Sequence, residues 1–129
     1  MTHETAYARA GVDIAAGDRA VELMKEHVAG TRRPEVLGGL GGFAGFFDAA
    51  TFKDYRHPVL ATSTDGVGTK VDIARRMKVY DPIGFDLMGM LVDDLVVVGA
   101  EPLFVTDYIS CGHVDPEVIA SIVKGIAQA

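Results

Sequence analysis

The 129-residue sequence has one cysteine, no tryptophan and few basic residues, and each of these shortages excludes a class of protein. A single cysteine, Cys111, cannot form an internal disulfide, which is typical of a reducing compartment. Twelve basic residues against 18 acidic ones give a net charge of −6, which argues against a general binder of nucleic acid or anionic membranes. No apolar run approaches the ~20 residues of a membrane span, and the first residues lack a signal-peptide pattern. These features predict a soluble, cytoplasmic globular domain.

The stretch from Val59 to Lys70 carries the strongest chemical signal. Residues 59–63 form a short apolar run after a proline, which is typical of a β-strand. The segment that follows, TDGVGTK at 64–70, brings together a carboxylate, two glycines, a hydroxyl and an ammonium. Glycine allows close backbone approach to a ligand, lysine suits phosphate, and aspartate is a ligand that magnesium prefers. The stretch predicts a site for a metal-bound polyphosphate, with a tight turn and a surface lysine as the alternative.

Two familiar phosphate-binding motifs are absent. The P-loop needs adjacent Gly and Lys followed by Ser or Thr, but Thr69 separates Gly68 from Lys70. The glycine-rich run at 38–43 matches the dinucleotide fingerprint only loosely, because no strand pattern precedes it. Four glycines in these six residues predict either a flexible linker or a mobile cover whose N–H groups meet phosphates.

Four stretches have helical periodicity together with start or stop signals. We expect helices at about 18–29, 71–79 and 82–98, and a last helix from 116 onward. The expected boundary residues are Asp18, Asp81 and Asp115 as N-caps and Gly30 and Gly99 as stops.

The expected helix at 82–98 is apolar nearly all round, which predicts burial in the domain or against a partner. Three acids interrupt it. Ionised carboxylates on a buried helix are costly unless they are paired or bind metal. Asp86, Asp93 and Asp94 therefore favour a site over a solvent-facing stripe.

Alternation of helices with strands at 59–63 and 103–109 predicts an α/β layered fold, a mixed sheet with helices on one face. Two clear strands are too few for a stable sheet. We expect further strands from weak segments at Leu37 or Phe47 onward, from missing sequence, or from a second copy of the chain.

Five stretches in this order resemble the N-terminal part of the phosphoribosylformylglycinamidine cyclo-ligases, also called aminoimidazole ribonucleotide synthetases. The stretches are 11–14, 31–36, 38–43, 64–70 and 94–104. The resemblance implies an ATP- and Mg²⁺-dependent ligase that closes the imidazole ring of formylglycinamidine ribonucleotide in de novo purine (IMP) biosynthesis. It also implies an N-terminal ATP-binding domain whose sheet pairs with that of a second copy in a homodimer.

The resemblance also implies roles for individual residues. Asp65 and Asp94 resemble magnesium ligands, and Lys70 with the N–H groups around it resembles a phosphate contact; Lys70 and Asp65 are the expected catalytic residues. The family commonly has Asn where Asp93 stands, so Asp93 either helps to bind metal or replaces an amide hydrogen bond. The expected nucleotide-binding residues are Gly38, Gly39, Gly41, Gly42, Phe43, Asp65, Gly66, Gly68, Thr69 and Lys70.

The resemblance further implies that residues 1–129 are an incomplete N-terminal ATP-binding and dimerisation domain, with the C-terminal domain absent from this chain and little catalysis by the chain alone. Three other ATP users of the superfamily are alternatives: thiamine-monophosphate kinase, selenophosphate synthetase and formylglycinamidine ribonucleotide synthase. Selenophosphate synthetases use a cysteine or selenocysteine near the N-terminus, and none precedes Cys111. A non-catalytic dimerisation module is the alternative of a different class.

Overall fold

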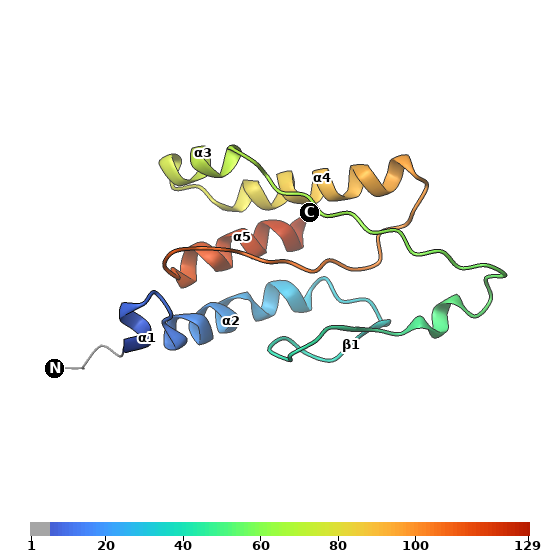
Figure 1. Cartoon of the computed structure of the whole chain (residues 1–129), viewed down its shortest axis with the longest axis horizontal. Helices are drawn as coiled ribbons and strands as arrows, with labels where there is room; N and C mark the ends of the chain where they lie inside the picture. The colour runs from blue at the N-terminus through green and yellow to red at the C-terminus, as the bar shows by residue number, and fades with distance from the viewer. Residues whose placement is uncertain (1–5) are drawn as a thin grey trace.

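The computed structural model describes residues 6–129, and its main feature is a single layer of helices (Figure 1). Helix α5 lies between α2 and α4, and α3 packs beside the first part of α4. The elements in chain order are α1 (Ala6–Arg9), α2 (Ile14–Ala29), β1 (Val36–Leu37), β2 (Phe46–Phe47), the 3-10 helix η1 (Ala49–Phe52), α3 (Lys70–Met77), α4 (Asp81–Val97) and α5 (Pro116–Gln128).

Capping side chains account for two helix starts, and the four expected helices are all confirmed. The carboxylate of Asp115 accepts from the backbone N–H of Val118 at 3.2 Å, so α5 begins as predicted. The start of α2 was predicted five residues too late, because Asp13, not Asp18, caps it, accepting from Ala16 N–H at 3.0 Å.

The start of α4 also differs from the prediction in its cap. Asp81 is the first helical residue, and Tyr80 is the N-cap without a side-chain hydrogen bond. Pro82 still occupies the first turn, where its missing N–H has no intrahelical partner to lose. Gly99, with φ +74°, reverses the chain after the helix as expected.

Helices α4 and α5 cross with their backbones in contact. A Cβ atom placed on Gly84 would lie 2.2 Å from the backbone nitrogen of Ile126, and one on Gly125 would lie 1.9 Å from the carbonyl oxygen of Asp81. Both glycines are buried. Only hydrogen fits at these two positions, and this contact fixes how α4 is held over α5.

The sheet is smaller than the sequence predicts. Strands β1 and β2 pair antiparallel in the register Val36↔Phe47 and Leu37↔Phe46, where the weak strand segments were expected. The strands expected at 59–63 and 103–109 are not formed, and both segments run across the helical layer outside any sheet. An extended sequence becomes a strand only when a neighbour takes its backbone hydrogen bonds. The fold is thus mixed helix and small sheet, consistent with α/β, and the predicted larger mixed sheet is absent from residues 6–129.

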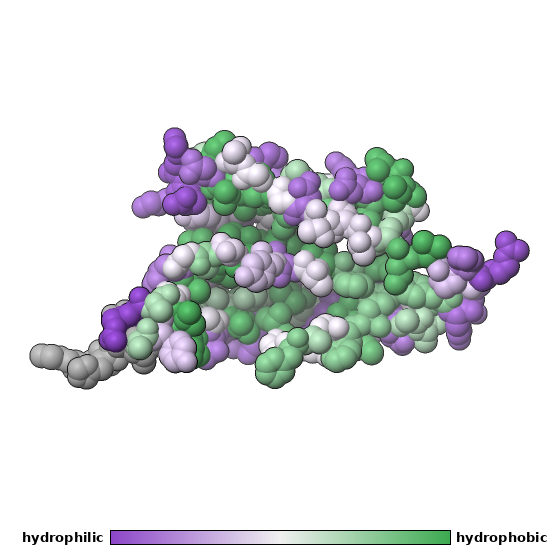
Figure 2. All heavy atoms as spheres, in the orientation of Figure 1, coloured by the Kyte–Doolittle hydropathy of each residue, from purple (hydrophilic) through white to green (hydrophobic). Residues whose placement is uncertain are grey.

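Much apolar surface remains exposed. The accessible surface is 9920 Å², whereas a folded monomer of this length exposes about 6,600 Å². Within the described range, the buried apolar residues are Ala20, Ala74, Ile83 and Val123. Figure 2 shows apolar side chains spread over the central part of one face. None of the helices in residues 6–129 is long and apolar enough to cross a membrane.

Helix α4 is only partly buried within the chain, so of the two expected alternatives, burial in the domain accounts for its beginning alone. Ile83 and Gly84 in its first turn are buried, but Val96 is 60% exposed and Val97 81% exposed. The end of α4 extends past the part of α5 that covers its beginning. Burial of this end against a partner stays a prediction.

Candidate functional site

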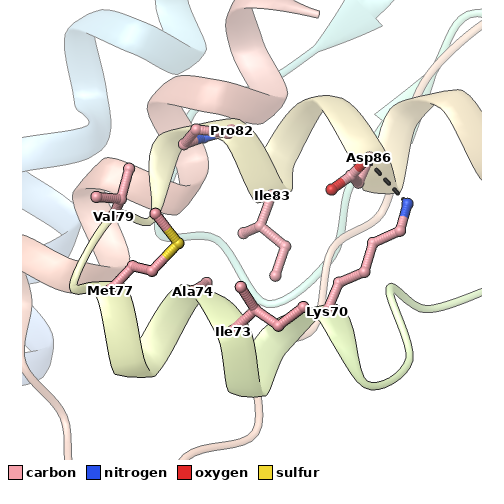
Figure 3. Close-up of a pocket in the computed structure, with 8 residues that line it drawn as sticks. All are labelled: Lys70, Ile73, Ala74, Met77, Val79, Pro82, Ile83 and Asp86. Carbon is pink, nitrogen blue, oxygen red and sulfur yellow. Dashed lines mark hydrogen bonds and ion pairs between the residues drawn. The ribbon is translucent and has the colours of Figure 1, made fainter.

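Lys70, the predicted phosphate contact, is the first residue of α3 and reaches across to α4. Its Nζ lies 3.0 Å from Oδ1 of Asp86. Both side chains stand at one end of a groove of about 440 Å³ between the two helices, with apolar walls (Figure 3). The lining residues are Lys70, Ile73, Ala74, Met77, Val79, Pro82, Ile83 and Asp86. The groove therefore includes the predicted lysine but none of the predicted metal ligands.

The backbone before Lys70 forms an open loop that ends in a turn. Gly68 has φ +59°, a conformation that glycine adopts without strain, and α3 begins two residues later. The backbone N–H of Gly66 donates to Oδ1 of Asp65 at 2.7 Å. Asp65 is exposed, so its carboxylate can also accept or coordinate other groups. The N–H of Gly66, expected to face phosphate, here donates to this carboxylate.

Asp94, in the last turns of α4, contacts the same stretch. The hydroxyl of Ser63 donates to Oδ2 of Asp94 at 2.9 Å. The contacts Ser63–Asp94 and Lys70–Asp86 show that residues 63–70 run antiparallel to α4. Asp86 and Asp94 are eight residues apart, which is about 12 Å along the helix axis. Asp65 lies within this run, two residues from Ser63. Asp65 and Lys70 therefore belong to a segment that runs along α4, the helix that carries Asp94.

The predicted metal ligands are not gathered into a closed cluster. In the part of the chain that is described, no three His, Cys, Asp or Glu side chains lie close enough to hold a metal ion together. Asp93, Asp94 and Asp65 are all exposed, which differs from the buried acids expected on α4. The carboxylates avoid the cost of burial because α4 presents this side to solvent.

The glycine-rich loop lies between β1 and β2. Gly38 and Gly41 have φ of +84° and +97°, and Phe43 is fully exposed. In Figure 1 this hairpin lies on the α2 side of the helical layer, while residues 64–70 lie on the α3 side. A single chain therefore does not hold the loop over Lys70, and its role over a triphosphate stays a prediction.

Arg33 anchors the base of this loop to the turn after α4. Its Nε lies 3.1 Å from Oε2 of Glu35, and its Nη1 lies 3.3 Å from the carbonyl oxygen of Pro102 and 3.6 Å from Oε1 of Glu101. The pKa of Glu35 is lowered, first by a hydrogen bond from its own backbone N–H and then by Arg33. Farther along the chain, desolvation raises the pKa of Asp107.

Replacing Arg33 with alanine should loosen the loop base. The substitution removes the contacts of Arg33 with Glu35, Glu101 and the Pro102 carbonyl, so local opening should become about two- to fivefold more frequent. Limited proteolysis within residues 38–45, followed by mass spectrometry, measures this. Arg76→Ala, at an exposed arginine of α3 that pairs with Asp72, is the matched control. Equal cleavage rates in the two variants would contradict the anchoring role.

Sequence reasoning missed three of these contacts. Ser63, Asp86 and Arg33 find their partners 31, 16 and 69 residues away. Asp86 was noted as an acid on an apolar helix, but no local pattern assigns it to Lys70. The pairing of Asp86 with Lys70 could have been predicted from the short turn between the two expected helices, because such a turn places α3 and α4 side by side.

Comparisons with known proteins support one family. The family model described as AIR synthase related protein, N-terminal domain, matches residues 47–129. A phosphoribosylformylglycinamidine cyclo-ligase of Geobacillus sp. (strain WCH70) is 62% identical over 123 residues, which is 95% of this chain and 35% of that protein. Proteins of the same name in Lachnoclostridium phytofermentans and Leptospira interrogans are 53% and 49% identical over 122 and 128 residues. The alignments cover 95% and 99% of this chain, which spans 36% and 37% of the length of these two relatives.

Proposed function

The chain belongs to the family of AIR synthase related proteins, through the N-terminal domain of that family, and from this we propose that it forms the ATP-binding part of a phosphoribosylformylglycinamidine cyclo-ligase. The relatives that carry this name are about three times as long as the chain. The complete activity is therefore proposed for a protein of their full length. In it, this chain contributes the phosphate-facing stretch 63–70 and helix α4.

The proposed reaction is an ATP-dependent ring closure. ATP phosphorylates the amide oxygen of formylglycinamidine ribonucleotide, and a nitrogen of the same substrate then attacks the activated carbon. The oxygen leaves with the phosphoryl group as inorganic phosphate, and ADP is the other product. An amide oxygen is a poor leaving group until it is phosphorylated, so the protein has mainly to position the two substrates and to neutralise charge.

One observation carries the proposal: residues 63–70 lie along α4, held at Ser63–Asp94 and Lys70–Asp86. Lys70 would contact phosphate oxygens, with Asp65 and Asp94 as the metal ligands. Mg²⁺ usually takes one or two carboxylates and completes its shell with phosphates and water, so two separated acids fit it without a preformed cluster. Bound there, Mg²⁺ would neutralise phosphate charge.

A homodimer is part of the same proposal. The excess exposed surface, the unpaired segments 59–63 and 103–109 and the exposed end of α4 all support a second copy of the chain as the missing neighbour. A second copy could also bring its glycine-rich loop toward Lys70. A cytoplasmic location fits this proposal, because the lone Cys111 cannot form an internal disulfide and is exposed and free.

Calorimetric titration of the chain with Mg-ATP tests the proposal. We expect a Kd between about 1 μM and 1 mM, and about tenfold weaker binding for Lys70→Ala, the effect of one charge-assisted hydrogen bond. Lys25→Ala is the matched control, because Lys25 makes a similar exposed pair with Glu22 on α2. No heat from the wild-type chain would reject nucleotide binding, and identical titrations for wild type and Lys70→Ala would reject the role of the lysine.

A further inference from the structure

Helices α3 and α4 form a short hairpin in which Lys70 and Asp86 face each other. The turn between the helices covers residues 78–80, so the pair lies at the open end of the groove, away from that turn. The ammonium–carboxylate distance is 3.0 Å, with the lysine side chain 54% and the aspartate side chain 43% exposed. The pair is therefore accessible to a ligand that approaches this end of the groove.

Apolar packing fixes the two backbones that carry this pair. Ala74 of α3 and Ile83 of α4 are buried between the helices, and Ile73 and Met77 line the same wall. Figure 3 shows the lysine side chain extended across the open end of the groove toward α4. Because these contacts hold α3 and α4 together, the carboxylate of Asp86 has a fixed position relative to α3, and the flexible Lys70 side chain can bind to it there.

We propose that Asp86 is a positioning residue for Lys70: it holds the ammonium at the open end of the α3–α4 groove, ready to receive the phosphates of a nucleotide. The inference rests on the function proposed above for Lys70. An ammonium has three N–H donors, so a single bond to Asp86 leaves two for phosphate oxygens. Asp86 acts on the ligand through the lysine.

Two opposing effects decide the sign of an Asp86 substitution. An unrestrained lysine loses rotamer freedom when it binds, which can cost about tenfold in affinity. The negative charge of Asp86 repels phosphate, but water screens it at this exposure, and the repulsion is worth a smaller factor. Asparagine separates the two effects, because it keeps an acceptor oxygen for the ammonium and removes the charge.

Calorimetric titration with Mg-ATP tests the inference on the wild type, Asp86→Asn and Asp86→Ala, each also in a Lys70→Ala background. We expect Asp86→Asn to bind at least as tightly as the wild type and Asp86→Ala to bind about three- to tenfold more weakly. Neither substitution should weaken binding once Lys70 is alanine. Asp72→Ala is the matched control, since Asp72 is an acid of α3 that pairs with Arg75 and Arg76 instead.

A ligand-free measurement accompanies the titrations. In the NMR spectrum of the free chain, the ammonium resonance of Lys70 should move in Asp86→Ala and much less in Asp72→Ala. An unmoved resonance would overturn the inference, as would Asp86→Ala binding as tightly as the wild type. Weaker binding by Asp86→Asn with a shifted magnesium requirement would make Asp86 a metal ligand instead. No heat from the wild-type chain would instead reject nucleotide binding, and identical titrations for wild type and Lys70→Ala would reject the role of the lysine. Both outcomes differ from a failure of the inference on Asp86, in which the Lys70 effect remains.

Discussion

Gly125→Ala is expected to lower the free energy of unfolding of the chain by about 3 kcal/mol, because the new methyl group has no space between α4 and α5. Its Cβ would lie 1.9 Å from the carbonyl oxygen and 2.8 Å from the carbonyl carbon of Asp81. These are backbone atoms, so no side-chain rotation relieves the clash and the helices must move apart. Alanine is the better helix former by about 1 kcal/mol, which offsets part of the loss.

The matched control is Gly89→Ala in the same helix pair. Gly89 lies within α4, and a Cβ placed there meets nothing within 4 Å. The same substitution should therefore stabilise the chain by about 0.5–1 kcal/mol, because only the helix propensity changes. Urea unfolding followed by circular dichroism measures both variants. If the unfolding midpoints of both variants shift in the same direction, α4 and α5 leave space for a methyl group at Gly125, which contradicts the prediction.

The helices could be predicted from the sequence because their signals are local. Asp115 caps α5 as expected, and Gly99 ends the turn after α4. The start of α2 was placed too late because residues 14–17 have no clean apolar period, and two aspartates, Asp13 and Asp18, stand where a cap could be. A capping side chain is identified by the N–H group it reaches, and spacing alone does not reveal this.

The strands could not be predicted in the same way because pairing is not local. Residues 59–63 and 103–109 have the composition of strands, yet within residues 6–129 neither finds a neighbour to pair with. In the described range only the segments around Leu37 and Phe47 pair, since the loop of residues 38–45 turns the chain back between them. A strand pattern thus indicates that a segment can form a strand, and the sheet forms only where a second segment lies beside it to pair with.

The candidate site was predicted in its residues but not in its contacts. The stretch 64–70 and the acids of α4 were identified by their chemistry, and the acids were taken to lack partners. In the structure Lys70 compensates Asp86, and Ser63 donates to Asp94. Which acid each residue of the stretch meets depends on the direction in which the stretch runs along α4. That direction is set by the packing of the helices, which the local sequence does not reveal.

Asp94→Ala should lower magnesium-dependent turnover by about two orders of magnitude or more in a protein of the relatives' full length. Asp94 is the proposed metal ligand at the end of α4, and its loss would leave the charge of the transferring phosphoryl group without support. Steady-state assays with formylglycinamidine ribonucleotide, ATP and saturating Mg²⁺ measure the effect. Binding of the ribonucleotide alone should change little, because the lost interaction is with metal and phosphate.

Two further variants separate the charge of Asp94 from its surroundings. Ser63→Ala removes the hydroxyl that donates to Asp94 at 2.9 Å and leaves the carboxylate, so we expect a loss of about tenfold or less. Asp93→Asn changes the neighbouring exposed acid to the residue that the family resemblance implies there, and it should keep most of the activity. If Asp94→Ala keeps its turnover at saturating Mg²⁺ while Asp93→Asn loses it, the metal ligand on α4 is Asp93.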